Sequence, residues 1–99
     1  MKSVIQLDYD NCYMCGATVG LEEHHIFTAS NRKKSEKYGY KVRLCSNHHR
    51  GSPDGIHHNR KFDLLLRRIA QEYWEETNTR QDFINLFGRN YLGLEVENE

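Results

Sequence analysis

Apolar residues in the second half of the chain recur with the period of an α-helix. Six of them follow an i, i+3, i+4, i+7, i+8, i+11 pattern, namely Phe62, Leu65, Leu66, Ile69, Ala70 and Tyr73. This spacing places apolar side chains on one face of a helix. We therefore expect a long amphipathic helix that begins near Ile56 or His57 and ends near Glu76.

A second, shorter helix is predicted after a break. Thr79 and Asp82 have the spacing of a capping box, and Gly88 is suited to end the helix. The side chains expected to face the core are Phe83, Leu86 and Phe87. The acidic segment 95–99 is expected to be frayed.

The first half of the chain has shorter apolar runs with the alternation typical of strands. Residues 17–27 predict a hairpin that continues as a strand through Leu21 and Ile26, and the segment from Tyr40 to Leu44 predicts another strand. The order strand, strand, helix indicates an α+β fold.

The connecting segments are less regular. Residues 4–9 predict a short strand or an extended segment, and the polar, basic residues 28–37 predict a loop or a short helix. Residues 50–55 are rich in turn formers.

The composition is that of one small domain, residues 1–99, with 37% hydrophobic and 28% charged residues. A bound metal would add stability to a domain with so small a hydrophobic core. The chain has no apolar run near the roughly 18 residues of a membrane span, and its first residues lack a signal-peptide core. A cytoplasmic protein that does not enter membranes is therefore expected.

Charge is distributed unevenly, although the net charge is zero. Residues 1–23 carry a net charge of −3, residues 24–68 carry +8, and residues 69–99 carry −5. A basic middle segment favours a polyanionic partner such as nucleic acid, the alternative being lysines that only solvate the surface. The candidate phosphate contacts are Arg32, Lys33, Lys34, Lys37, Lys41 and Arg43, followed by a second group of Arg50, Arg60, Lys61, Arg67 and Arg68.

Three cysteines and one histidine have the spacing of a structural zinc site. Cys12 and Cys15 form a C-x2-C turn, and Cys45 and His48 repeat that spacing. Together they supply four ligands for a tetrahedral Zn²⁺. A redox C-x-x-C or inert buried thiols are the alternatives, and His49 is the rival fourth ligand.

The other histidines predict a second metal site. His24 and His25 occupy the first strand, His49 follows the predicted zinc ligand, and His57 and His58 stand where the long helix begins. These places would converge in the predicted fold. Because the zinc takes only one histidine, a second site with an open coordination position accounts best for the rest.

The combined pattern CYMC…EEHHIF…LCSNHHRGSPDGIHHN, over about residues 12–68, resembles HNH endonucleases of the zinc-knuckle kind common in phage and restriction genes. The resemblance implies a ββα-metal fold over about residues 12–76, with an added C-terminal helix over about residues 79–88. It also implies hydrolysis of a DNA phosphodiester with one divalent cation. No separate sequence-recognition module is evident, so weak sequence preference on double-stranded DNA is expected.

The resemblance implies roles for single residues. In the family, the residue matching His24 binds the catalytic metal and the one matching His25 is the general base. His49 and His57 match the later metal ligands, with His58 or Asn59 as alternatives to His57. Imidazole ligands suit Mn²⁺, Ni²⁺, Co²⁺ or Zn²⁺ as well as Mg²⁺. Apart from the resemblance, a backbone carbonyl or a carboxylate is expected to orient the base; Glu22 and Glu23 are the candidate carboxylates, the alternative being that both are solvated surface charges.

The chain departs from the family pattern in places. Tyr40 stands where the family has its middle Asn, and Asn31, Asn47 and Asn59 are the candidate substitutes. His48 stands where a cysteine is usual, and the spacing from His49 to His57 is wide. Two alternatives to a nuclease follow: a zinc-knuckle DNA-binding protein with a degenerate site, or an interaction module of a phage DNA-processing complex. A partner protein or a homodimer fits all of these.

Overall fold

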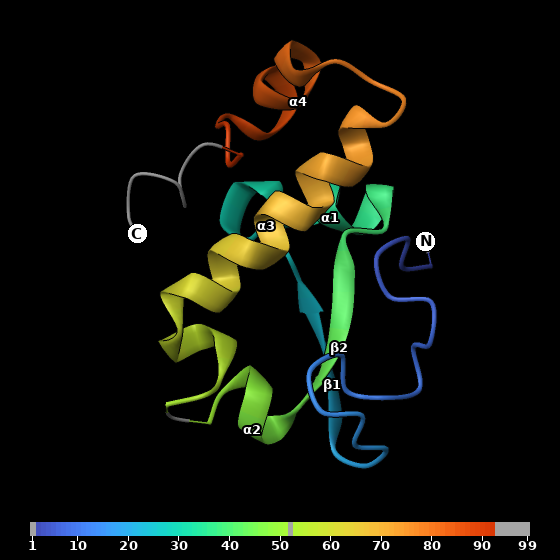
Figure 1. The fold of residues 1–99 in the computed structure, drawn as a ribbon, viewed down its shortest axis with the longest axis vertical. Helices are drawn as coiled ribbons and strands as arrows, with labels where there is room; N and C mark the ends of the chain where they lie inside the picture. The colour runs from blue at the N-terminus through green and yellow to red at the C-terminus, as the bar shows by residue number, and fades with distance from the viewer. Residues whose placement is uncertain (1, 52, 93–99) are drawn as a thin grey trace.

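The computed structural model describes residues 2–51 and 53–92 and has a two-stranded sheet beside four α-helices (Figure 1). In chain order the elements are β1 (Leu21–His25), the 3-10 turn η1 (Ala29–Asn31), α1 (Arg32–Tyr38), β2 (Lys41–Cys45), α2 (Ser46–His49), the 3-10 turn η2 (Ile56–His58), α3 (Arg60–Glu75) and α4 (Arg80–Phe87). The predicted α+β class is confirmed. The predicted acidic tail, residues 95–99, lies outside the described residues.

The two strands are antiparallel and pair from Leu21 with Cys45 to His25 with Lys41. The partner of β1 is therefore β2, so the hairpin predicted within residues 17–27 is not formed. The segment that joins the strands contains η1 and α1. This long connection brings the end of β1 beside the start of β2.

The N-terminal segment 4–9 is not a strand but covers the edge of β2. Ser3 Oγ donates to Lys41 O at 2.6 Å, and Arg43 N donates to Gln6 Oε1 at 2.7 Å. An unpaired strand edge exposes backbone donors and acceptors. These two side chains form hydrogen bonds with the edge of β2 that a third strand would otherwise form.

A buried serine and a glycine fix the connection between the strands. Phe27 N donates to Ser35 Oγ at 3.1 Å, and Ser35 Oγ donates to Tyr40 O at 2.5 Å. Gly39 ends α1 with φ +75°, and a Cβ there would collide with the carbonyl oxygen of Lys2. Only glycine fits this position without strain.

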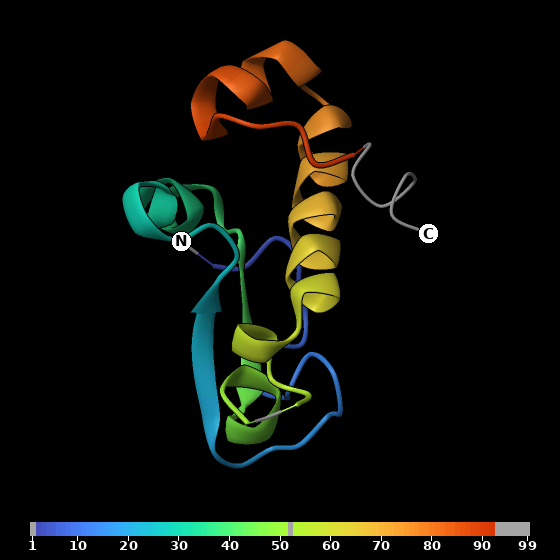
Figure 2. The same cartoon turned by 90° about the vertical axis from the view of Figure 1, so that its left-hand side faces the viewer.

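Helix α3 lies along one face of the sheet, and α4 crosses its C-terminal end (Figures 1 and 2). The buried residues of α3 are Phe62, Leu66, Ala70, Gln71 and Trp74. Leu65 and Tyr73 were expected inside but are 49% and 44% exposed. The helix is covered on one side only, so its buried stripe is narrower than the sequence pattern suggested.

Caps define the ends of both C-terminal helices. Asn59 Oδ1 accepts from Phe62 N at 3.1 Å to begin α3, and Thr79 Oγ1 accepts from Asp82 N at 3.1 Å to begin α4. Gly88 ends α4 as predicted, with φ +89°. Phe83 and Phe87 are buried, and Leu86 packs partly buried against the core.

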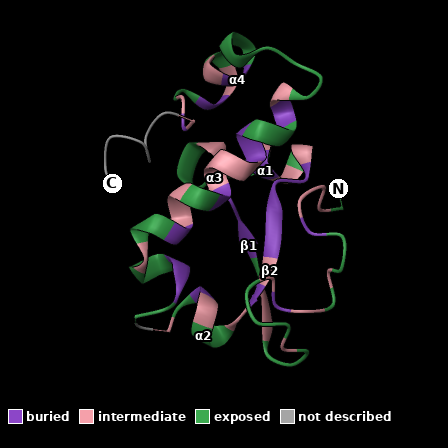
Figure 3. Cartoon of the chain, in the orientation of Figure 1, coloured by how far each residue is buried: buried purple, intermediate pink, exposed green. Residues whose placement is uncertain are grey.

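Aromatic side chains dominate the core between α3, α4 and the sheet (Figure 3). The ring centroids of Phe27 and Phe87 are 4.5 Å apart, and those of Phe83 and Phe87 are 4.8 Å apart. These aromatic contacts join α4 to the segment that follows β1. Within residues 2–51 and 53–92, no helix has the length and apolar character needed to cross a bilayer.

Candidate metal centres

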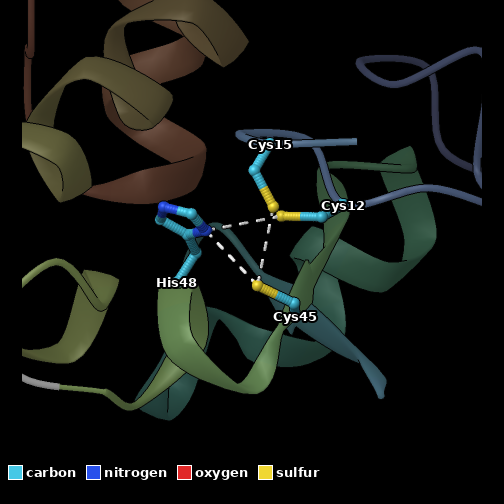
Figure 4. Close-up of side chains that lie close together, drawn as sticks. All are labelled: Cys12, Cys15, Cys45 and His48. Atoms are coloured by element: carbon cyan, nitrogen blue, oxygen red, sulfur yellow. Dashed lines mark hydrogen bonds between the residues drawn. The ribbon is translucent and has the colours of Figure 1, made fainter. Parts of the chain in front are cut away.

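The predicted zinc ligands come together at the end of β2 (Figure 4). Cys45 Sγ lies 3.3 Å from His48 Nδ1, Cys15 Sγ lies 3.8 Å from Cys45 Sγ, and Cys12 Sγ lies 3.8 Å from His48 Nδ1. A tetrahedron with Zn–S bonds of about 2.3 Å has edges of about 3.8 Å. The cluster could therefore hold a metal ion such as zinc.

Local backbone structure positions each pair of ligands. Gly16 N donates to Cys12 O at 2.9 Å and has φ +78°, which closes the first turn. Tyr13 N donates to Arg43 O at 2.8 Å and ties this turn to β2. Cys45 ends β2 and caps α2, so the first turn of α2 brings His48 back to it.

The Cys12 thiol has a lowered pKa, which favours its metal-binding thiolate form. Burial raises its pKa, but backbone hydrogen bonds from Cys45, Cys15 and Met14 outweigh burial and lower the pKa to about 6. Thiolates bind zinc. Cys12 therefore offers a thiolate at neutral pH.

A second cluster joins His24, His49 and His57, which come from β1, α2 and η2. One nitrogen of each imidazole lies within 4.8 Å of the others, and the Nε2 atoms of His49 and His57 are 3.2 Å apart. Nε2 of His24 is buried without a hydrogen-bond partner. The structure thus brings together the three predicted ligands of the catalytic metal.

Glu22 determines which nitrogen of His49 faces this cluster. Glu22 Oε1 lies 2.5 Å from His49 Nδ1, so Nδ1 donates its proton to the carboxylate and Nε2 carries the lone pair. That lone pair faces His57, and the orphaned Nε2 of His24 lies in the same cluster. A cation among these nitrogens would satisfy them together, so the donor set fits a divalent metal with imidazole ligands.

Burial favours the neutral form of two histidines of the cluster, His24 and His57. The pKa of His24 is lowered to about 3 by burial and by the nearby His49 and His57. The pKa of His57 is also lowered, by burial and by His49. Neutral imidazole is the form that binds metals.

The cluster opens onto a cleft of about 340 Å³ whose lining includes His24, His57, Arg60 and Arg67. His57 is exposed, whereas His24 and His49 are buried. The alternatives to His57 take other places: His58 is an exposed residue of the cleft, and Asn59 caps α3. The three-histidine cluster is therefore half-open, unlike a closed structural zinc site.

His25 belongs to a different network from His24. Its Nε2 lies 2.8 Å from Glu36 Oε1, and Lys41 Nζ lies 3.0 Å from Glu36 and 3.2 Å from Glu23. Successive strand residues project to opposite faces, which explains the separation. The side chains of Glu23, His25 and Glu36 form a third cluster of potential ligands, but the Lys41 ammonium already pairs with both of its carboxylates.

The carboxylate that orients His25 was missed at the sequence level. Glu22 and Glu23 were the expected partners, but Glu22 binds His49 while Glu23 binds Tyr9 and Lys41. The partner is Glu36, 11 positions away on α1. Its place in a basic segment gave no local signal of this role.

The basic residues predicted to contact DNA have different environments. Arg32, Lys33 and Lys37 are exposed on α1. Lys34 Nζ donates to Leu86 O, and Lys41 is buried between carboxylates. Arg43 stacks on the Tyr9 ring with 4.6 Å to the centroid.

Two of the asparagines considered as substitutes for a middle Asn, Asn31 and Asn59, have other partners. Asn31 Nδ2 donates to Phe87 O, and Asn59 caps α3. Tyr40 is a core residue, and the side chain that bridges the two strand ends is Ser35. Ser35 therefore supplies the local scaffold here.

Comparisons with protein-family models, curated proteins and solved structures gave no match. The likeness to HNH endonucleases stays a prediction from the motifs. The function has to be argued from the geometry of the site.

Proposed function

We propose that this protein is a metal-dependent DNA endonuclease or nickase of the HNH type. The observation that carries the proposal is the convergence of His24, His49 and His57 at a cleft, with Nε2 of His24 buried and unpartnered. A buried nitrogen without a partner is costly unless something binds it. Beside it, a closed Cys3His zinc would stabilise the scaffold.

The open geometry of the three-histidine cluster favours a catalytic role over a structural one. Three protein ligands at a half-open site leave positions for water and substrate. A divalent cation bound there would supply charge neutralisation to a phosphodiester and to the leaving oxygen. The chain's own contribution is to hold three imidazoles in place, with Glu22 orienting the ring of His49 through Nδ1.

His25 is proposed as the general base. Glu36 accepts a hydrogen bond from Nε2 of His25, which leaves the lone pair on Nδ1. No hydrogen bond to Nδ1 is formed by any described residue. An imidazole held in this way can accept the proton of a water that attacks a phosphodiester at the end of β1.

DNA is the proposed substrate because the middle of the chain is basic. Residues 24–68 carry a net charge of +8, and Arg60 and Arg67 line the cleft. Phosphate contacts of this kind position a duplex without specifying its sequence.

A second candidate is a zinc-knuckle DNA-binding protein with an inactive nuclease site. The observation that favours it is the burial of His25, whose side chain is 6% exposed and engaged by Glu36. In this second candidate, the burial of His25 excludes the water that a general base has to contact.

The two candidates are separated by incubating supercoiled plasmid with Mg²⁺ or Mn²⁺. The nuclease proposal expects cutting by the wild type and loss of cutting in His24→Ala and His25→Ala. His58→Ala is the matched control, since His58 lines the cleft outside the cluster. Intact plasmid with every metal would favour the binding protein, and equal loss in His58→Ala would reject the ligand assignment.

A further inference from the structure

Arg67 is the most firmly held cation in the cleft. It lies on α3, its side chain is only 18% exposed, and it shares the cleft lining with His24 and His57. Arg60, the other arginine of the cleft, has a side chain that is 64% exposed. Arg67 is therefore part of the wall of the site.

Hydrogen bonds and aromatic rings hold the guanidinium of Arg67 in place. Nε donates to Asp63 Oδ1 at 3.1 Å, and Nη1 donates to the Tyr91 hydroxyl at 3.1 Å. The group also lies 5.7 Å from the centroid of the Phe27 ring and 5.6 Å from that of Tyr91. These contacts fix its plane before any ligand binds.

These contacts leave some N–H donors of the Arg67 guanidinium unused. Two of the five N–H groups of a guanidinium are engaged here, so three have no partner among the described residues. Nη2 in particular makes no hydrogen bond with the described part of the chain. A partly buried guanidinium with free donors at a cleft is suited to an oxyanion.

The charge balance of the cleft also calls for an anion. The three histidines contribute no negative charge, so a divalent cation at the cluster would stand near the positive Arg67. The carboxylates described nearby are already engaged, Asp63 by Arg67 and Glu22 by His49. Two such cations repel each other unless an anion lies between them. A carboxylate-lined metal site would not have this requirement.

We propose that Arg67 is the phosphate-binding residue of the cleft and contacts the oxygens of the phosphodiester at the reacting position. This inference rests on the proposed nuclease function and names the substrate contact of the same site. It concerns a residue of the second basic group, whereas the sequence favoured the basic residues of the segment 32–43. The chemistry recognised is a phosphodiester of the DNA backbone and not a base.

The test measures DNA binding and cleavage separately. Binding of a fluorescent duplex is followed by anisotropy, with protein that holds its structural zinc and with no other divalent cation added. We expect Arg67→Gln to weaken affinity about tenfold and to lower the slope of log affinity against log salt by about 1. With the metal present, kcat should fall about 100-fold. Arg67→Lys should recover part of both effects, because it keeps the charge but loses the fork of donors.

Two further variants separate phosphate binding from a structural role. Asp63→Asn removes the partner but leaves the guanidinium, so it should lower thermal stability while DNA affinity is kept or increased. Arg80→Gln removes an exposed arginine of α4 that pairs with Glu75 and belongs to neither basic group, and it should change affinity less than twofold. Equal losses of affinity in Arg67→Gln and Asp63→Asn would overturn the proposal, as would wild-type affinity and kcat in Arg67→Gln.

The outcomes also separate this inference from the nuclease proposal. If the wild type cuts DNA and Arg67→Gln cuts equally well, the nuclease stands and the role of Arg67 is rejected. If the wild type cuts nothing while Arg67→Gln still loses affinity and salt slope, the phosphate contact stands and the nuclease is rejected.

Discussion

The carboxylate of Glu22 lies 2.5 Å from Nδ1 of His49, and Nε2 on the other side of that ring faces the three-histidine cluster. In metal sites, a carboxylate placed in this way fixes the tautomer of the histidine and raises its basicity as a ligand. The sequence placed Glu22 beside the catalytic base instead. In the structure, Glu22 instead contacts His49 of the three-histidine cluster.

Glu22→Gln should therefore weaken binding of a divalent cation at the second site. The expected loss is about 10- to 100-fold in affinity, because the amide no longer stabilises the ligand form of His49. Isothermal titration of Mn²⁺ into zinc-loaded protein measures it. Glu23→Gln is the matched control, since Glu23 binds Tyr9 and Lys41. Equal affinity in wild type and Glu22→Gln would contradict this assignment.

Glu36→Gln should slow DNA cleavage and leave DNA affinity unchanged. Glu36 holds Nε2 of His25, and its loss should remove part of the contribution of a general base, roughly 10- to 100-fold in rate. Single-turnover cleavage and anisotropy measure the two quantities. Glu72→Gln, an exposed carboxylate on α3 paired with Arg68, should cleave like the wild type. A Glu36→Gln protein that cleaves at the wild-type rate would remove Glu36 from the mechanism.

Ser35→Ala should destabilise the fold by about 1–3 kcal/mol, the cost of leaving a buried donor unsatisfied. Ser35 is fully buried and accepts from the N–H of Phe27. Urea unfolding of zinc-loaded protein measures the change in the free energy of unfolding. Ser30→Ala, at an exposed position, should change it little. If both variants are equally stable, Ser35 is not the scaffold of the strand connection.

His24 should remain neutral at pH 5 in protein without the second metal. Its folded-state pKa is about 3, against 6.5 for a free histidine. The unfolded chain therefore takes up a proton at His24 that the folded chain does not. The stabilising contribution of neutral His24 is complete above pH 6.5 and is lost as the pH falls from 6.5 toward 3. Long-range ¹H–¹⁵N NMR of the imidazole tests this, and a titration midpoint near 6.5 would show that His24 is not buried as described.

Local features of the fold were predictable, because short-range sequence decides them. The caps at Thr79 and Gly88 depend on neighbours within one turn, and the prediction there was right. The four residues of the Cys/His cluster, which could hold a metal such as zinc, were likewise found from two x2 spacings, since each pair is held by a single turn of chain. His24, His49 and His57 were selected by the resemblance to HNH endonucleases, together with the expectation that the first strand, the second x2 pair and the start of the long helix converge.

Long-range partners could not be found in this way. The pairing of β1 with β2, the bond from Glu36 to His25 and the burial of Lys41 all depend on how α1 folds back beside the sheet. The sequence alone does not distinguish a charged side chain that is solvated from one that forms an ion pair in the fold. Leu65 was misplaced because periodicity gives the apolar face of a helix but not how much of that face is covered.

The central claim is that the three histidines form a metal site on which DNA cleavage depends. The most direct measurement titrates Mn²⁺ into protein that holds one zinc, and follows bound Mn²⁺ by electron paramagnetic resonance and plasmid cleavage in the same samples. We predict one Mn²⁺ per chain, cleavage that rises in proportion to its occupancy, and loss of both in His24→Ala with the zinc retained. Cleavage that is independent of Mn²⁺ occupancy, or His24→Ala protein that binds Mn²⁺ and cuts like the wild type, would contradict the account.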